Sequence, residues 1–534
     1  MNIGKLSQLA GILLVALALN AQGATGNIRF DGGQPAGANP QPGFNRVIMP
    51  PVTPEESERA IYARALPVDL VQAIPSVKAP SSKLKTTVSV TLAAPTGPAS
   101  IAELARALKN DPDLIYEYVR DNIEYYPVWG VQKGPIGTIL DSRGTAFDQA
   151  ALMVSLLRQA GYTASYVKGQ LSLTAAQVHD WLGIDTSNVC AVINLLGQGQ
   201  IPIAPGSVIA SAAGSCPGST AALVSIKLSH VWVKATIGGT AYYFDPSYKP
   251  HTLKAGINLA LVTGYNAASY LNAAKSGATV TADYVRGINR NNIRNTLTTY
   301  ATNLANYLRS NQPAGVLEDV VGGMTINPHS GGNLRQSVLP YQDTTVALTE
   351  WTADIPANYR PTLHIQYQGI DKTYTSDALY GERLTITYNA SNQPVLMLDG
   401  VAQATGTAIT PGTDANVTFT VAHGAYASPD ANQSFTQPIK AGGTFLIGNG
   451  WGPAGRGLVE RYRTQLDEAK AAGNADTSET VLGSTLAVLS ATWIAQVNQA
   501  DYINDRLAQT NTLFHHQIGI AGYNTAAYVA GDAD

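Results

Sequence analysis

The strongest pattern of apolar and polar positions lies between Gly144 and Gly161. Apolar residues recur there at helical spacing, at positions 147, 150, 151, 154, 157 and 160. Three further apolar residues, at 152, 153 and 156, widen the apolar surface almost to the full circumference of the helix. Such a helix has to be buried on most sides. Gly144 and the first-turn carboxylate Asp148 mark its start, and Gly161 marks its end. The pattern therefore predicts a central buried helix whose N-terminal N–H groups stabilise negative charge.

A second pattern, further along the chain, predicts a β-hairpin. Two runs rich in β-branched and aromatic residues flank Gly238-Gly239, which is typical of a hairpin loop. With these glycines as the loop, Trp232 lies opposite Asp245, and His230 lies opposite Ser247. Residues two apart share one face of a strand, so His230 and Asp245 become diagonal neighbours, roughly 5 to 8 Å apart at the backbone. A histidine with a carboxylate that orients it is two-thirds of a nucleophile, base and orienting triad.

The other periodicities predict an α+β chain with several parts. Helical spacing is found at about 101–109, 113–125, 175–183, 283–310, 460–472 and 480–509, and strand patterns at 164–173 and in short alternating runs from 342 to 447. Residues 184–222 are rich in Ala, Gly and Ser and are expected to form a loop insertion. We therefore expect a signal peptide at 1–23, a Pro/Gly-rich leader at 24–98, an α+β domain at 99–260, a helical linker segment at 261–341, an antiparallel β-sandwich-like domain at 342–450 and a helical C-terminal region at 451–534.

Three motifs in order carry a family resemblance: the helix pattern with Asp148 and Ala150, then His230-Val-Trp-Val, then Asp245-Pro-Ser. Together they resemble the transglutaminase-like superfamily, whose fold is related to papain. The resemblance implies a Cys at the N-terminus of a buried helix, followed by a His and an Asp on adjacent strands. His230 and Asp245 match the family His and Asp, whereas Ala146 stands at the Cys position. Without sulfur there, the thiolate mechanism of the family is not available.

The chain resembles most closely a bacterial subgroup in which this domain lies near the start of large secreted proteins that later carry Rhs/YD repeats. The shared stretches are 113–125, 133–138, the central helix and 181–184. In that subgroup the Cys position often holds another residue, while Asp148-Gln149-Ala150 is kept. The resemblance implies a papain-like, transglutaminase-like domain at 99–260 and a place in a larger Rhs/YD-repeat system.

Composition and the N-terminus indicate the compartment. The 534 residues are only 13% charged with a formal net charge of −3, so no basic field is present to hold nucleic acid. Residues 1–23 have the features of a secretory signal, and their apolar run is too short to span a bilayer. We expect a secreted, periplasmic or cell-surface bacterial protein with no membrane span after signal removal. Cys190 and Cys216 are the only cysteines, and such a pair in an oxidising compartment favours a disulfide over a replacement nucleophile at Cys190.

Weaker signals leave several alternatives open. Asp148 is either a structural carboxylate of the helix N-terminus or a group that faces His230 in place of the sulfur. Thr145 and Ser142 are hydroxyl candidates near the same helix end. Trp129 is expected in a cleft wall, and Trp232 either lines the cleft or belongs to the core. A Gly-x-Gly-x-x-Gly match at 450–455 and the pair His515-His516 are interpreted as a turn and as structural residues, so no cofactor and no metal are expected.

Three functional hypotheses follow from these patterns. In the first, a transglutaminase-like domain without its thiol keeps the cleft and binds a peptide, a protein or a cell-envelope polymer. In the second, the chain is an active acyl transferase or amide hydrolase with a nucleophile other than Cys, working beside His230. In the third, the chain is a surface adhesion or export module that acts through the β-sandwich. The incomplete triad favours the first hypothesis over an enzyme.

Overall fold

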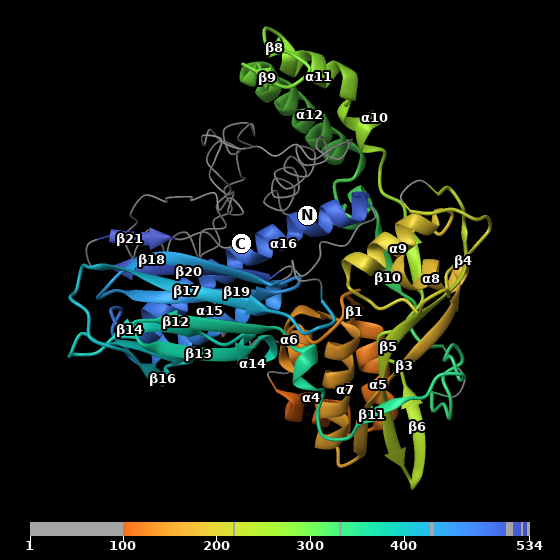
Figure 1. Cartoon of the computed structure of the whole chain (residues 1–534), viewed down its shortest axis with the longest axis horizontal. Coiled ribbons are helices and arrows are strands. Elements are labelled where there is room, and N and C mark those ends of the chain that lie inside the picture. The colour runs from red at the N-terminus through yellow and green to blue at the C-terminus, as the bar shows by residue number, and fades with distance from the viewer. Residues whose placement is uncertain are drawn as a thin grey trace, which may run out of the picture.

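The computed structural model describes residues 100–216, 219–330, 334–427, 432–508, 516–524 and 527–530. The predicted signal peptide and leader lie outside these ranges. Two lobes stand side by side, and a helical arm projects from them (Figure 1). Each lobe has its own hydrophobic core, one around the predicted central helix and one between two antiparallel sheets.

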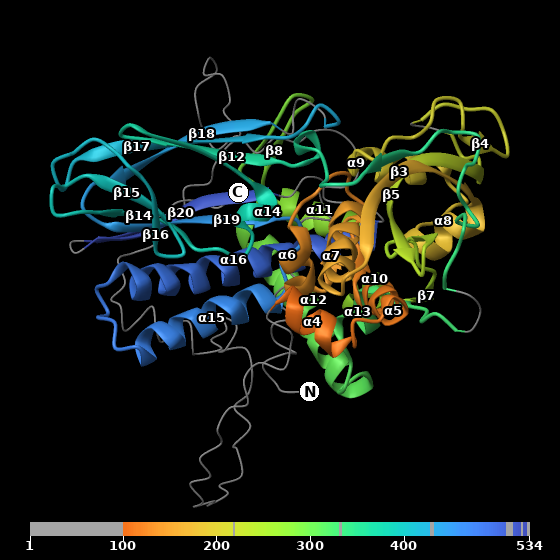
Figure 2. The ribbon, with the colours of Figure 1, turned by 90° about the horizontal axis from the view of Figure 1, so that it is seen from below.

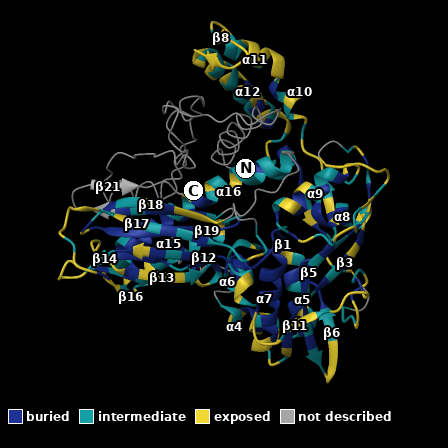
Figure 3. Cartoon of the chain, viewed as in Figure 1, coloured by how far each residue is buried: buried dark blue, intermediate teal, exposed yellow. Residues whose placement is uncertain are grey.

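The first lobe packs helices against a mixed set of strands. Its central helix α7 (Ala146–Gln159) has eleven buried residues and is dark blue along its length in Figure 3, as its near-circumferential apolar pattern predicts. The strand β3 (Thr163–Thr174) pairs with β5 (Leu223–Ile237) in an antiparallel sheet of order β11-β3-β5-β4, with β6 (Thr240–Phe244) on β5. The other elements of this lobe are α4 (Ile101–Ala107), α5 (Pro112–Asn122), β1 (Glu124–Tyr125), α6 (Gly134–Asp141), β2 (Arg143–Gly144) and α8 (Ala175–Leu182).

Two expectations for this lobe were wrong. The predicted loop insertion at 184–222 contains the helix α9 (Val189–Gln198) and the short strand β4 (Ile209–Ala210). Val192, Leu195 and Leu196 of α9 are buried in the first core, so this helix of the segment belongs to the core of the lobe. The strand β11 (Thr349–Trp351) was expected in the sandwich, but it pairs with β3. The chain therefore returns to complete the first sheet after the helical arm.

The arm and its base occupy residues 251–326. A two-stranded sheet of β7 (His251–Lys254) and β10 (Gly323–Ile326) closes the base. The predicted helix at 283–310 begins later, as α12 (Arg290–Asn311), because residues 285–286 form a strand. Most of the arm is exposed or intermediate (Figure 3). Its remaining elements are α10 (Leu259–Thr263), α11 (Ala267–Lys275), β8 (Thr279–Val280), β9 (Val285–Arg286) and α13 (Leu317–Val321).

The second lobe contains two antiparallel sheets whose buried residues form one core. The sheet orders are β13-β12-β17-β18 and β16-β15-β14-β19-β20-β21, and the helices α15 and α16 lie along one side of the strands (Figure 2). Alternating side chains of β12 and β17 are buried, as the sequence pattern predicts for strands with one face on a core. The bounds are β12 (Thr362–Tyr367), β13 (Ile370–Thr375), β14 (Leu384–Tyr388), β15 (Pro394–Leu398), β16 (Val401–Thr405), β17 (Asp414–Ala422), β18 (Gln433–Lys440) and β19 (Thr444–Trp451), with the short helices η1 (Ala357–Tyr359) and α14 (Ser376–Leu379).

The C-terminal region is not purely helical, contrary to expectation. After α15 (Arg456–Ala471) and α16 (Glu479–Ala508), the strand β20 (His516–Asn524) pairs along the whole of β19, and β21 (Ala527–Ala530) follows. Among the described residues α16 is the one helix long and apolar enough to cross a membrane by length and composition, a test that a core helix also passes. Its residues Leu486, Val488 and Ile494 are buried, and the first two belong to the second core.

A buried ion pair of the first lobe hydrogen-bonds to groups of the second lobe. Lys133 Nζ lies 2.6 Å from Asp141 Oδ2, both side chains being at most 1% exposed. The same ammonium donates to Pro453 O, and Asp141 accepts from the hydroxyl of Tyr380 and from the N–H of Gly455. Because the ammonium and the carboxylate are buried and both bond to groups of the second lobe, this cluster fixes α6 of the first lobe against the second.

Candidate functional site

The hairpin of β5 and β6 brings His230 and Asp245 together. The pairs run from Val233 with Phe244 to Ile237 with Thr240, which confirms the register predicted from the Gly238-Gly239 loop. The ladder ends at Phe244, and Asp245 follows it directly. The Nε2 atom of His230 lies 3.2 Å from each carboxylate oxygen of Asp245. The predicted juxtaposition of the two residues is therefore present.

Asp245 is held by the turn that follows it. Its Oδ1 accepts hydrogen bonds from the N–H groups of Ser247 and Tyr248, at 3.1 and 3.0 Å, and from the Ser247 hydroxyl at 2.9 Å. Burial opposes ionisation of this carboxyl, but His230 and these donors outweigh it and lower its pKa. A carboxylate fixed in this way holds the imidazole in one orientation.

Ser247 is a site residue that the sequence reasoning missed. Its Oγ lies 2.9 Å from His230 Nε2, and the residue is fully buried. The signal was available, because the predicted register already set Ser247 opposite His230. The three side chains of His230, Asp245 and Ser247 thus form one hydrogen-bonded cluster.

An aromatic shell closes over this cluster. The rings of Tyr125 and Trp181 stack at 4.7 Å, and both meet the His230 ring edge-on, at 6.4 and 5.4 Å. On the Asp245 side, Tyr341 donates to Oδ2 at 3.4 Å and packs against Tyr248 at 3.9 Å. His230 is 1% exposed and Asp245 is fully buried. The open cleft that was expected over the His–Asp pair is therefore wrong for this structure, because side chains from distant segments fill it.

The two tryptophans expected near the cleft belong to the core. Trp232 is fully buried, and its ring lies over Gly169 so closely that a Cβ atom there would come within 2.3 Å of it. Trp129 is 3% exposed and meets Phe147 edge-on at 4.8 Å. Neither side chain is accessible to a ligand in this structure, so the assignment of both as binding residues is corrected to a packing role.

The N-terminus of α7 is capped by Thr145 and Asp148. Asp148 N donates to the Thr145 hydroxyl, and Thr145 N donates to Asp148 Oδ2, which is a reciprocal capping box. The same hydroxyl also donates to Gly130 O at 2.8 Å. Oδ1 of Asp148 accepts from three consecutive N–H groups of the loop before α6, those of Gln132, Lys133 and Gly134. The hydrogen bonds of Asp148 and Thr145 thus go to the helix cap and this loop, so a role as catalytic groups or binding residues is corrected to a structural one.

Ala146 is the first residue of α7, directly after this cap, and it is 3% exposed. The two cysteines of the chain, Cys190 and Cys216, are bonded to each other. The predicted disulfide is therefore present, and Cys190 is not a replacement nucleophile. No free cysteine remains in the chain.

Residues 99–246 match the family model of the transglutaminase-like superfamily. This segment is a transglutaminase-like domain. The matched range begins just before α4 and ends one residue after Asp245, so it includes α7, β3, β5 and the His–Asp pair. No curated protein and no solved structure is similar enough to the chain to match it.

The remaining sequence signals lie outside this domain. The glycine-rich segment at 450–455 connects β19 to α15, and β19 has only antiparallel neighbours, which is the wrong setting for a dinucleotide site. His516 lies 3.5 Å from His423, and His515 is outside the described residues. Within the described ranges, no three His, Cys, Asp or Glu side chains are grouped to hold a metal ion.

Proposed function

We propose that this chain is an exported transglutaminase-like protein that binds a peptide, a protein or a cell-envelope polymer without thiol-dependent acyl transfer. The observation that carries the proposal is the absence of a thiol: Ala146 stands at the family Cys position and both cysteines form a disulfide. Acyl transfer in this superfamily needs a thiolate at the N-terminus of the buried helix. The resemblance to Rhs/YD-repeat-associated proteins supports a place for this binding role in a larger secreted system.

The disulfide also supports export, because such bonds persist mainly in oxidising compartments. Burial supports a role other than catalysis. A substrate carbonyl has to approach both a nucleophile and its base to within about 3 Å, whereas His230 is 1% exposed and Ala146 is 3% exposed. In this role the His230, Asp245 and Ser247 cluster keeps the hairpin against the domain.

A second candidate function, amide hydrolysis or acyl transfer with a hydroxyl nucleophile, is favoured by one contact. Ser247 Oγ lies 2.9 Å from His230 Nε2, which is the distance needed for a base to take its proton. The same Oγ also lies 2.9 Å from Asp245 Oδ1, so this hydroxyl supports the carboxylate instead of facing a substrate. Its complete burial makes the binding role the stronger proposal.

The experiment compares amine incorporation and amide hydrolysis on a broad peptide mixture by the unmodified chain, His230→Ala and Ala146→Cys, with Ser247→Ala as a follow-up. We expect the unmodified chain and His230→Ala to give the same background rate. Activity of the unmodified chain that is lost in His230→Ala would overturn the proposal and establish an enzyme with a nucleophile other than sulfur. Ser247→Ala then identifies that nucleophile. The third form, Ala146→Cys, restores the thiol, and a His230-dependent gain of activity in it would show that the missing sulfur alone had silenced the site.

A further inference from the structure

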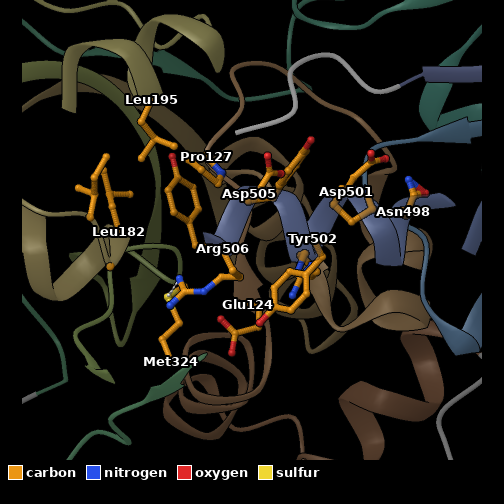
Figure 4. A pocket seen from close by; sticks show the side chains of 16 residues that line it. Glu124, Pro127, Leu182, Leu195, Met324, Asn498, Asp501, Tyr502, Asp505 and Arg506 are labelled. Atoms are coloured by element: carbon orange, nitrogen blue, oxygen red, sulfur yellow. Dashed lines mark hydrogen bonds between the residues drawn. The ribbon is translucent and has the colours of Figure 1, made fainter. Parts of the chain in front are cut away.

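A cavity of about 160 Å³ lies between the transglutaminase-like domain and α16 (Figure 4). One wall comes from β1 and β2, the two short strands that lead toward α7, and the opposite wall from Asn498, Asp501, Tyr502, Asp505 and Arg506 of α16. Residues three and four apart on a helix share a face, so these five residues lie on one broad face of α16, with Asp501 and Asp505 toward one edge of it and Arg506 toward the other. Tyr125 lies between this cavity and His230, since it lines the cavity and also packs against the His230 ring.

The guanidinium groups of Arg143 and Arg506 line the cavity. Within the residues that the structure describes, neither forms an ion pair with a carboxylate. Arg506 Nη1 lies 3.8 Å from the sulfur of Met324, and its buried Nε has no hydrogen-bond acceptor among the residues that the structure describes. The guanidinium lies at the C-terminal end of α8, where Nη1 is 3.4 Å from the position of a Cβ on Gly183. A helix C-terminus stabilises positive charge. Arg143 lies over the ring of Tyr502 at 5.2 Å.

Carboxylates occupy a different part of the same wall. Asp501 and Asp505 are one turn apart on α16, and Figure 4 shows them pointing away from the side on which Arg506 reaches Met324. Burial raises the pKa of Asp501 to about 6. Below the helix in this view, Glu124 is 3.5 Å from His251 Nε2. The cavity thus presents acidic and basic groups at separate places.

The size and the apolar part of the wall limit the ligand further. Leu182, Ile184, Leu195 and Met324 contribute apolar surface beside the charged groups. A cavity of about 150 Å³ accommodates a benzene-sized group, so this one has room for the apolar side chain of a small ligand and not for a folded domain. An apolar side chain on a small charged ligand fits such a lining.

We propose that this cavity binds a small zwitterion, an amino acid or dipeptide with an apolar side chain, whose carboxylate faces Arg506 and Arg143 and whose ammonium group faces Asp501 and Asp505. A guanidinium binds a carboxylate through two parallel hydrogen bonds, which sets the orientation of the ligand. The inference rests on the proposed function and gives that binding role a place and a ligand chemistry. Because α16 forms one wall, the site needs both lobes of the chain.

The test is isothermal titration of the full-length chain at pH 7.5 with leucine and with Leu-Leu, the two sources of this chemistry. N-acetyl-leucine lacks the ammonium group, and leucinamide lacks the carboxylate, so each removes one half of the recognition. We expect leucine or Leu-Leu to bind at least tenfold more tightly than either blocked compound. Whichever of leucine and Leu-Leu binds more tightly shows whether the cavity takes a free amino acid or a dipeptide.

Two variants locate the binding in the cavity. Arg506→Gln is expected to lower the affinity for the zwitterion at least tenfold and to leave the affinity for leucinamide unchanged. Asp505→Asn is expected to lower the affinity for the zwitterion and to leave that for N-acetyl-leucine unchanged. Arg456→Gln is the matched control, since Arg456 is 83% exposed on α15 and does not line the cavity. A thermal melt within about 2 °C of the unmodified chain shows that each variant is folded.

No heat with either leucine or Leu-Leu would overturn the inference, and so would equal affinity for the free and the blocked compounds. Binding that is unchanged in both Arg506→Gln and Asp505→Asn would also overturn it, because the ligand would then lie elsewhere. None of these results bears on the proposed function. The proposed function is tested separately, by comparing the activity of the unmodified chain with that of His230→Ala. Conversely, His230-dependent activity would overturn the proposed function whatever the titration shows.

Discussion

Asp148 offers the sharpest test of the structure, because one carboxylate connects two separate parts of the domain. Oδ1 accepts from the N–H groups of Gln132, Lys133 and Gly134 at 2.9 to 3.1 Å. Oδ2 accepts from Thr145 N at 3.1 Å and from its hydroxyl at 3.2 Å. All of these groups are buried. The side chain therefore holds the loop before α6 against the start of α7.

The expected loss of stability follows from counting donors. Asp148→Ala leaves four backbone N–H groups without an acceptor, and each buried unsatisfied donor costs about 1 to 3 kcal/mol. The lower value gives a loss of about 4 kcal/mol, which is comparable with the whole free energy of unfolding of many domains. Asp148→Asn keeps the Oδ1 acceptor but sets an NH₂ group against the N–H of Thr145, so it loses one bond and the charge, about 2 kcal/mol.

Urea unfolding followed by tryptophan fluorescence measures both losses, since Trp129 lies in the loop that Asp148 holds. We expect midpoints in the order unmodified chain, Asp148→Asn, Asp148→Ala. Asp283→Asn serves as the control, because Asp283 is exposed on the arm. The reasoning is refuted if both Asp148 variants unfold within about 0.5 kcal/mol of the unmodified chain, or if the Asn variant is the less stable of the two.

Three further predictions use other buried groups. Burial lowers the pKa of the Lys249 ammonium to about 7, so the unfolded chain binds the extra proton between about pH 7 and 10, and stability rises with pH there by up to about 1.4 kcal/mol per unit. Urea midpoints should show this slope in the unmodified chain and not in Lys249→Met, and an equal slope in both would contradict it. Reduction of the Cys190–Cys216 disulfide, which closes a separation of 26 residues, should cost about 3.5 kcal/mol in the chain-entropy model, and a double Ser variant should have the same stability with or without reductant. Finally, iodoacetamide should alkylate Ala146→Cys at least tenfold more slowly than Ala267→Cys, because both positions begin a helix but only Ala146 is buried; equal rates would mean that the site opens freely.

Several parts of the structure could be predicted from sequence because they depend on neighbours along the chain. The apolar spacing of α7 predicted a helix buried on most sides, and Gly238-Gly239 predicted the register that sets His230 beside Asp245. The bounds of β12 and β14 also agree with their alternating patterns. In each case the signal is a period or a turn within a few residues, and local backbone geometry converts it directly into structure.

Only the tertiary structure decided the features that join distant segments. Tyr341 contacts Asp245 from far along the chain, β11 and β20 complete sheets begun much earlier, and Arg506 shares a cavity with Tyr125. No periodicity records which distant side chain will fill a space, because that depends on packing between elements. The sequence by itself therefore determined the buried central helix and the hairpin that sets His230 beside Asp245. The closure of the site over His230 by Tyr341 and the adjacent cavity arise only when the two lobes and the returning segments pack together.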